Sequence, residues 1–200
     1  MYSLVIFILF GARSLSTDDA YIADEGNFEL EVGYEFNEVE HSCEISLKHG
    51  ITSRLDFAII VPYFVAPDQQ IGIAEFCIKY SLLCEGNKIP GISVSFANEL
   101  GASEYILNGI ISKRLGDIGL HLNFIYIPNN KVNCSVAFEL PLQKFTFVSE
   151  AIYESENSLE VLIGGDFLLF REIVLDLGIG KGFNEAQQEW KIVSGLTGAF

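Results

Sequence analysis

Apolar and polar residues alternate along most of the chain after Asn27. In residues 28–36, every even position is apolar and every odd position is Glu or Gly. A period of two places the two kinds of side chain on opposite faces of a strand, whereas a helix would scatter them around its circumference. This pattern predicts about twelve strands and no helix after the first residues. The same alternation, strong or weak, returns in segments 43–48, 55–63, 76–80, 92–96, 105–112, 118–126, 132–140, 145–153, 159–167, 173–179 and 190–200.

Short turn-forming segments separate these strands. Segments 84–90, 98–103 and 128–131, for example, contain Gly, Pro, Asn or Ser. One strand plus one turn takes roughly 12 to 15 residues, which is typical of an up-and-down antiparallel meander that closes into a barrel. Because no linker interrupts the series, we predict a single all-β domain over residues 27–200.

The composition narrows the class of protein. Half of the residues are apolar, the mean hydropathy is +0.32, and 12 Lys and Arg stand against 27 Asp and Glu, which gives a net charge of -15. A chain this apolar is not a disordered acidic tail, and its negative charge repels the phosphates of nucleic acid. No apolar run approaches the roughly 18 residues of a spanning helix. Two classes remain: a soluble β-barrel that binds an apolar ligand, and a transmembrane β-barrel.

Three features favour the transmembrane β-barrel, in which the apolar phase faces lipid and the polar phase faces the lumen. The polar phase is rich in Gly, Ser, Asn and single carboxylates, which suit a confined lumen. Aromatic residues gather near strand ends, as in the interfacial girdles of membrane barrels. If the N-terminus lies in the periplasm, the odd-numbered connections are acidic apart from Lys131, and the even-numbered ones carry Arg54, Lys88, Arg114, Lys144 and Arg171.

Both ends of the chain carry targeting features. Residues 2–10 are apolar and precede Gly11 and Ala12, which indicates a secretory signal peptide over residues 1–12. The alternative for these residues is a buried first strand or helix. Residues 13–26 are expected to form a periplasmic N-terminal segment, and its first part can fold into the lumen. The last strand keeps its alternation and ends at Phe200, which predicts an assembly signal for the barrel-assembly machinery.

An acidic set of side chains faces the lumen if the even positions of the first strand face lipid. The charges can form a salt-bridged interior that fills a narrow barrel, or they can line a passage that favours cations. Twelve strands enclose a bore between those of packed eight-strand barrels and open porins. The candidate lumen-lining residues are Glu29, Glu31, Glu35, Glu44, Lys48, Asp56, Glu75, Lys79, His121, Asn123, Glu139, Glu150, Glu160, Asp166, Asp176 and Lys191.

Catalytic and metal-binding motifs are not evident in the sequence. The four cysteines are widely spaced and the three histidines are far apart, so we expect no metal site, no disulfide framework and no cofactor. Residues 178–182 resemble a phosphate-binding loop, but no helix N-terminus follows to hold the anion. His121 is expected to be a hydrogen-bonded lumen residue rather than a catalytic base. The chain is therefore not expected to be an enzyme.

An ordered series of short segments runs through most of the chain after Ala12. Residues 15–20 and 26–31 begin it, and segments 49–56, 61–63, 78–80, 113–117, 121–123 and 150–153 follow. In this order they resemble the outer-membrane transporters associated with the meta pathway of phenol degradation. The first two segments are similar to that family's mature N-terminus and first strand. Two departures are Ser14, where the family usually has Pro, and residues 96–101, which replace a Pro-Thr-Gly stretch.

The resemblance implies an outer-membrane barrel through which small hydrophobic or aromatic solutes pass without a cofactor, and it supplies no catalytic residues. Together with the alternation, it predicts a location in the outer membrane of a Gram-negative bacterium. The expected partners are membrane lipid, the barrel-assembly machinery and a small solute, but not nucleic acid. One alternative is a structural or surface-interaction barrel with a closed lumen. The other is the soluble β-barrel that binds an apolar ligand.

Overall fold

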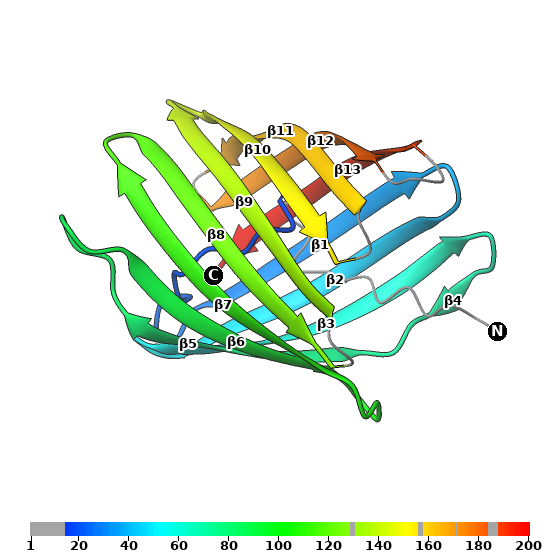
Figure 1. Ribbon diagram of the computed structural model, residues 1–200, viewed down its shortest axis with the longest axis horizontal. Coiled ribbons are helices and arrows are strands. Elements are labelled where there is room, and N and C mark those ends of the chain that lie inside the picture. The colour runs from blue at the N-terminus through cyan, green and yellow to red at the C-terminus, as the bar shows by residue number, and fades with distance from the viewer. Residues whose placement is uncertain (1–14, 129–130, 156–157, 171, 184–187) are drawn as a thin grey trace.

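The computed structural model is an all-β barrel (Figure 1). It describes residues 15–128, 131–155, 158–170, 172–183 and 188–200. Because β4 covers only two residues, twelve long strands build the wall. The strands are β1 (Phe28–Asn37), β2 (His41–Thr52), β3 (Leu55–Ala66), β4 (Gln70–Ile71), β5 (Glu75–Leu83), β6 (Gly91–Glu99), β7 (Tyr105–Leu115), β8 (Ile118–Ile127), β9 (Lys131–Leu142), β10 (Phe145–Glu154), β11 (Ser158–Phe170), β12 (Ile173–Phe183) and β13 (Gln188–Ala199).

The wall is a continuous antiparallel ladder. Each long strand pairs with the next long strand along the chain, and β1 pairs with β13 to close the ring. At this closure Phe28 and Phe200 exchange two backbone hydrogen bonds of 2.9 Å. Closure satisfies the backbone groups that an open sheet would leave at its edges. The predicted up-and-down barrel of about twelve strands is confirmed, and the addition is β4, which folds back on the end of β3.

The two ends of the barrel differ in charge. We call the end where β1 starts and β13 ends the terminal end, and the opposite one the loop end. Glu38, Asp68, Glu99 and Glu104 lie at the loop end, and Arg54, Lys88, Arg114 and Lys144 lie at or beside turns of the terminal end. These residues lie at the predicted ends, and the acidic Glu85, Asp117 and Glu172 also lie at turns of the terminal end, which therefore carries both signs of charge. Other residues of that prediction, among them Asn129, Asn130, Glu156, Arg171 and Glu185, lie outside the described residues.

The outer face of the barrel is apolar and much of the inner face is polar. On β1, Val32 is 38% exposed and Phe36 is 39% exposed, whereas Glu31 is only 1% exposed. A soluble barrel would turn its apolar side chains inward, so this exterior counts against the soluble alternative and suits contact with lipid. In the described part of the chain, no helix is long and apolar enough to cross a membrane.

Apolar side chains interrupt the polar inner face in two places. Both groups are buried inside the barrel, so they are not part of the lipid-facing surface. The first apolar cluster consists of Leu15, Ala137, Val148 and Leu162, with Val193 packed against it, and the second consists of Ala97, Ile106, Ile125 and Ile127, with Cys77 packed against it.

Candidate functional site in the barrel lumen

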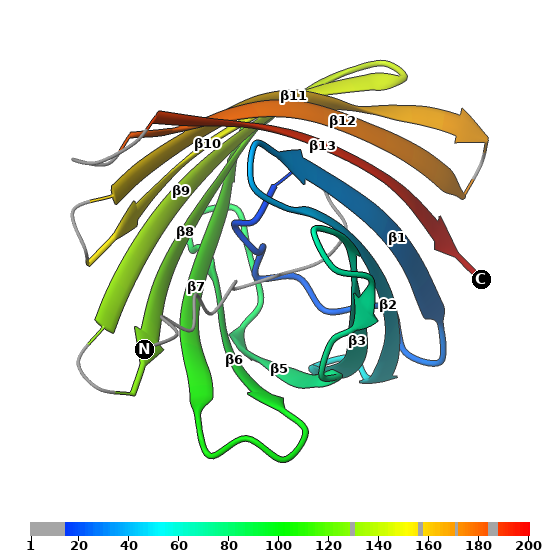
Figure 2. The same cartoon turned by 90° about the vertical axis from the view of Figure 1, so that its right-hand side faces the viewer.

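Residues 15–25, which we call the lumen segment, lie inside the barrel. Figure 2 looks through the barrel and shows this segment, in blue, within the ring of strands. Leu15 is 7% exposed and Ala20 is 4% exposed. Its backbone pairs with the wall at a single described bridge, between Glu25 and Gly50. The contacts that hold the rest of the segment come from side chains of the inner face.

Glu150 on β10 holds the start of the lumen segment. Glu150 is only 3% exposed. Its two carboxylate oxygens accept hydrogen bonds from the backbone N–H groups of Ser16 (2.9 Å) and Thr17 (2.8 Å). A buried carboxylate needs such donors in place of lost water. Leu15, the preceding residue, fills the first apolar cluster. Glu150 is therefore an anchor for the segment.

Asn123 and Lys79 hold the segment at Asp18. The Asn123 side chain accepts from the backbone N–H of Asp18 at 3.0 Å and donates to its carbonyl oxygen at 2.8 Å. The Asn108 side chain donates to Oδ1 of the Asn123 side chain at 2.8 Å and so fixes the orientation of that amide. The Lys79 ammonium lies 3.1 Å from the Asp18 carboxylate and 3.2 Å from the Asp19 carbonyl oxygen. One buried cation thus compensates acidic groups of the segment.

Two serines of the wall bind Ala20 from both sides. Ser112 on β7 accepts a hydrogen bond from the Ala20 N–H at 2.8 Å, and Ser93 on β6 donates to the Ala20 carbonyl oxygen at 2.6 Å. Ser112 also lies 2.8 Å from Nδ1 of His121, whose Nε2 is 3.5 Å from a carboxylate oxygen of Glu139. This chain of contacts runs from the lumen segment to β9.

The last part of the segment leaves the lumen beside Gly50. Asp56 on β3 accepts a hydrogen bond from the Ala23 N–H at 3.0 Å. A side chain at Gly50 would collide with the carbonyl oxygens of Ala23 and Asp24, which crowd its Cα. The residue is therefore Gly because the backbone of the segment passes directly over it.

A tyrosine–glutamate contact fastens the segment at the terminal end. The Tyr21 hydroxyl donates to Glu85 at 2.7 Å, and Glu85 also accepts from Lys113 (2.9 Å) and from the backbone N–H of Arg114 (2.8 Å). The pKa of Tyr21 is raised to about 12, mainly by burial and to a smaller extent by the interaction with Glu85. Burial alone would raise the pKa of Glu85, but the hydrogen bonds from its three donors lower it to about 2. Glu85 is therefore ionised over the whole neutral range.

The candidate residues predicted from the sequence lie on the inner face, where they play different parts. Asp56, Lys79, Asn123 and Glu150 contact the lumen segment directly, and His121 does so through Ser112. Asp166 and Asp176 lie opposite each other on β11 and β12. Another group forms ion pairs within the wall: Lys48 with Glu29 (3.3 Å) and Glu31 (3.7 Å), and Lys191 with Glu35 (3.8 Å) and Glu160.

Glu44 and Glu75 differ from these groups. Glu44 on β2 is 6% exposed, and neither of its carboxylate oxygens has a hydrogen-bond partner among the described residues. Glu75 faces inward at the start of β5, opposite Glu99 on β6. Both belong to the half of the barrel nearer the loop end. They therefore place two carboxylates, neither of them in an ion pair with a described residue, on the loop side of the lumen segment.

The contact of Ser112, His121 and Glu139 has the order of a serine–histidine–carboxylate triad. Ser112 is 0% exposed, however, and its hydroxyl already binds Ala20. Without access for a substrate, this geometry serves to hold the lumen segment rather than to attack an ester. Among the described residues, no group of His, Cys, Asp or Glu is arranged to hold a metal ion.

No protein-family model matches this sequence, and no match was found among curated proteins. The family resemblance drawn from short segments is therefore not confirmed. Solved structures do resemble the fold. The KdgM porin in complex with disordered oligogalacturonate has a TM-score of 0.70 at 13% identity, over 86% of this chain and 99% of that one. An outer-membrane channel from Pseudomonas putida F1 has a TM-score of 0.66 at 11% identity, over 91% and 98%.

Outer-membrane phospholipase A from Escherichia coli is a further structural neighbour, with a TM-score of 0.54 at 7% identity, over 87% of this chain and 90% of that one. At such identities the similarity establishes the fold alone. This chain has the fold of bacterial outer-membrane barrels, and the three neighbours reported are by name a porin, a channel and a phospholipase. The predicted outer-membrane location agrees with both this fold and the apolar exterior.

Proposed function

We propose that this protein is a passive outer-membrane channel for small solutes whose bore is occupied by its own lumen segment. The observation that carries the proposal is the way the segment is held. The wall closes through its own strand ladder, whereas the segment is bound mainly by side chains such as Glu150 and Asn123. Its release would leave the barrel intact and would uncover a polar, charged inner face.

The structural neighbours support a channel rather than an enzyme. Two of those reported above are a porin and an outer-membrane channel by name, and the serine–histidine contact in this lumen is covered. The terminal end, where both ends of the wall meet, then faces the periplasm. In this orientation Phe200, which directly follows β13, lies at the periplasmic end, where the assembly signal is expected.

The lining favours neutral or cationic solutes. Carboxylates outnumber ammonium groups among the candidate lumen residues. An excess of negative charge repels anions inside a narrow bore, where screening is weak. A polyanion such as the oligogalacturonate bound by the KdgM porin would not be the solute here. We propose small neutral or cationic molecules, including ones with an apolar or aromatic body.

Planar-bilayer recordings test the proposal. The full protein is compared with a variant that lacks residues 15–24, after heat-modifiable migration on a gel has shown that both form barrels in the membrane fraction. We expect a low conductance for the full protein, a severalfold higher one for the variant, and a reversal potential that indicates cation preference. The same low conductance in both proteins would refute the channel.

The alternative is a structural barrel whose lumen stays closed. The ion pairs of Lys48 and Lys191 favour it, because these wall side chains fill part of the bore. The deletion distinguishes the two functions, since a lumen filled by wall side chains would remain closed after the segment is removed.

A further inference from the structure

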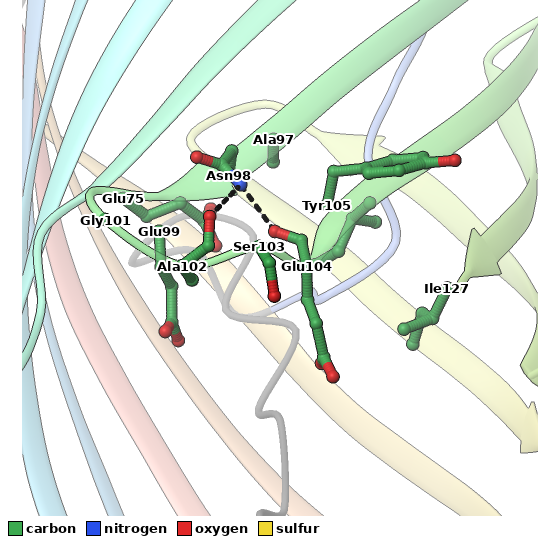
Figure 3. A pocket seen from close by; sticks show the side chains of 11 residues that line it. Glu75, Ala97, Asn98, Glu99, Gly101, Ala102, Ser103, Glu104, Tyr105 and Ile127 are labelled. Atoms are coloured by element: carbon green, nitrogen blue, oxygen red, sulfur yellow. Dashed lines mark hydrogen bonds between the residues drawn. The ribbon is translucent and has the colours of Figure 1, made fainter. Parts of the chain in front are cut away.

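A cavity at the loop end of the barrel has features of a ligand site. It measures about 350 Å³ and is formed at the loop ends of β5 to β8 and by the connection between β6 and β7. Figure 3 shows this connection, with the carboxylates of Glu99 and Glu104 extending to the same side of it and Ser103 between them. The lumen segment binds further along the same strands, at Ser93 and Ser112. The cavity therefore lies on the loop side of the segment.

One wall of the cavity is apolar. Ala97, Ile106 and Ile127 contribute to its lining and belong to the second apolar cluster. Within a barrel whose inner face is otherwise largely polar, this cluster gives an apolar surface that the lumen segment does not cover. A cavity of about 150 Å³ accommodates a benzene ring. The larger cavity here has room for one ring and a short side chain.

The other wall is acidic, and none of its carboxylates forms an ion pair with a described residue. Glu75 on β5 and Glu99 on β6 lie directly opposite each other in the register, an arrangement that costs free energy unless a cation intervenes. Glu104 adds a third carboxylate. Glu44, 94% buried and without a hydrogen-bond partner among the described residues, lies in the same half of the barrel.

The rim of the cavity is held in a defined shape. The Asn98 side chain donates to the carbonyl oxygens of Ala102 (3.4 Å) and Glu104 (2.5 Å). The backbone N–H of Leu100 donates to Ala74 at 2.8 Å and joins the connection to the residues before β5. A rim fixed in this way loses little conformational entropy when a ligand binds.

We propose that this cavity binds a small organic cation that consists of an apolar or aromatic body and an ammonium group. The apolar body would lie against Ile106 and Ile127, and the ammonium group would bind Glu75, Glu99 and Glu104. The proposal deepens the channel function by naming a class of solute and a site at which it is captured before passage, and to that extent it rests on that function.

Calorimetric titration of the detergent-solubilised full-length protein at neutral pH tests the proposal with four probes. 2-Phenylethylammonium carries both features, 2-phenylethanol lacks the charge, 3-phenylpropionate reverses it, and methylammonium lacks the apolar body. We expect saturable binding of 2-phenylethylammonium, about tenfold or more weaker binding of the alcohol and of methylammonium, and none of the anion. Equal binding of the aromatic cation and the alcohol, or no binding of the cation, would overturn the proposal.

Two matched variants locate the site. Glu75→Gln removes one carboxylate from the cavity, whereas Glu38→Gln removes one from the same end of the barrel outside it. We expect the first to weaken binding of 2-phenylethylammonium about five- to tenfold and the second to leave it unchanged. An equal loss of binding in both variants would show that only long-range electrostatic attraction acts on the probe, and would refute the site. If Glu75→Gln fails the heat-modifiability test for folding, the probe series on the unmodified protein still decides.

The titration and the bilayer recordings fail independently. Binding without conductance in the segment-deleted variant would refute the channel and keep the cation site. Conductance without selective binding of 2-phenylethylammonium would keep the channel and refute the site.

Discussion

Replacing Glu150 by Ala should release the start of the lumen segment. The change removes two hydrogen bonds, of 2.9 and 2.8 Å, that Ser16 and Thr17 donate to a buried carboxylate. A hydrogen bond to a charged group contributes about 1.5–3 kcal/mol. The lower value for both bonds gives a loss of about 3 kcal/mol, which corresponds to a change on the order of a hundredfold in the ratio of released to bound segment.

Single-channel recordings measure that ratio as the open fraction of the protein. Glu44→Ala is the matched control, because it removes the same carboxylate from the inner face at a residue without a hydrogen bond to the lumen segment. We expect the open fraction to rise strongly for Glu150→Ala and to stay near that of the unmodified protein for Glu44→Ala. Equal open fractions in the two variants would show that lumen charge, rather than the anchoring of the segment, controls opening.

Two further predictions concern the other end of the segment. Gly50→Val should raise conductance while the barrel still forms, because the new side chain displaces the carbonyl oxygens of the lumen segment. Gly109→Ala is the control and should leave conductance unchanged, because its added carbon has no neighbour closer than 4.0 Å. The pKa of Glu85 lies below its ordinary value, so its contact with Tyr21 stabilises the closed form above a pH of about 4.5 and is lost as the pH falls through about 2. Conductance should therefore rise across that acidic range. In Tyr21→Phe the contact is already absent, so conductance should be raised at neutral pH and the acid-dependent rise should disappear; an unchanged pH profile in this variant would contradict the assignment.

The wall of the barrel could be predicted from local pattern. In β1, alternate residues such as Leu30 and Glu31 already assign opposite faces, because side chains of a strand point alternately to its two sides. If the two faces exchanged places, the polar and charged side chains would face lipid and the apolar side chains would face the lumen. Strand number, strand order and the lipid-facing phase follow from that constraint, and the short turns leave little freedom in how consecutive strands pair.

The lumen site could be predicted only in part. Carboxylates such as Glu44 and Glu150 occupy equivalent inward positions in the sequence pattern, yet one lacks a hydrogen-bond partner in the described structure and the other anchors the lumen segment. Ser93 and Ser112 were not among the predicted site residues. Neither serine has a local signal that separates it from other small polar residues of the inner face, since its role depends on which backbone group lies opposite.

The alternation along this chain determined a closed antiparallel wall, an apolar exterior and an acidic lining. Only the tertiary structure decided what fills the lumen. Ser16 and Glu150 are separated by 134 positions, and their contact exists because closure of the β1–β13 seam brings the far wall of the barrel next to the start of the chain. Local periodicity specifies the face on which a side chain lies, but the partner across a closed lumen depends on the radius and register of the whole barrel.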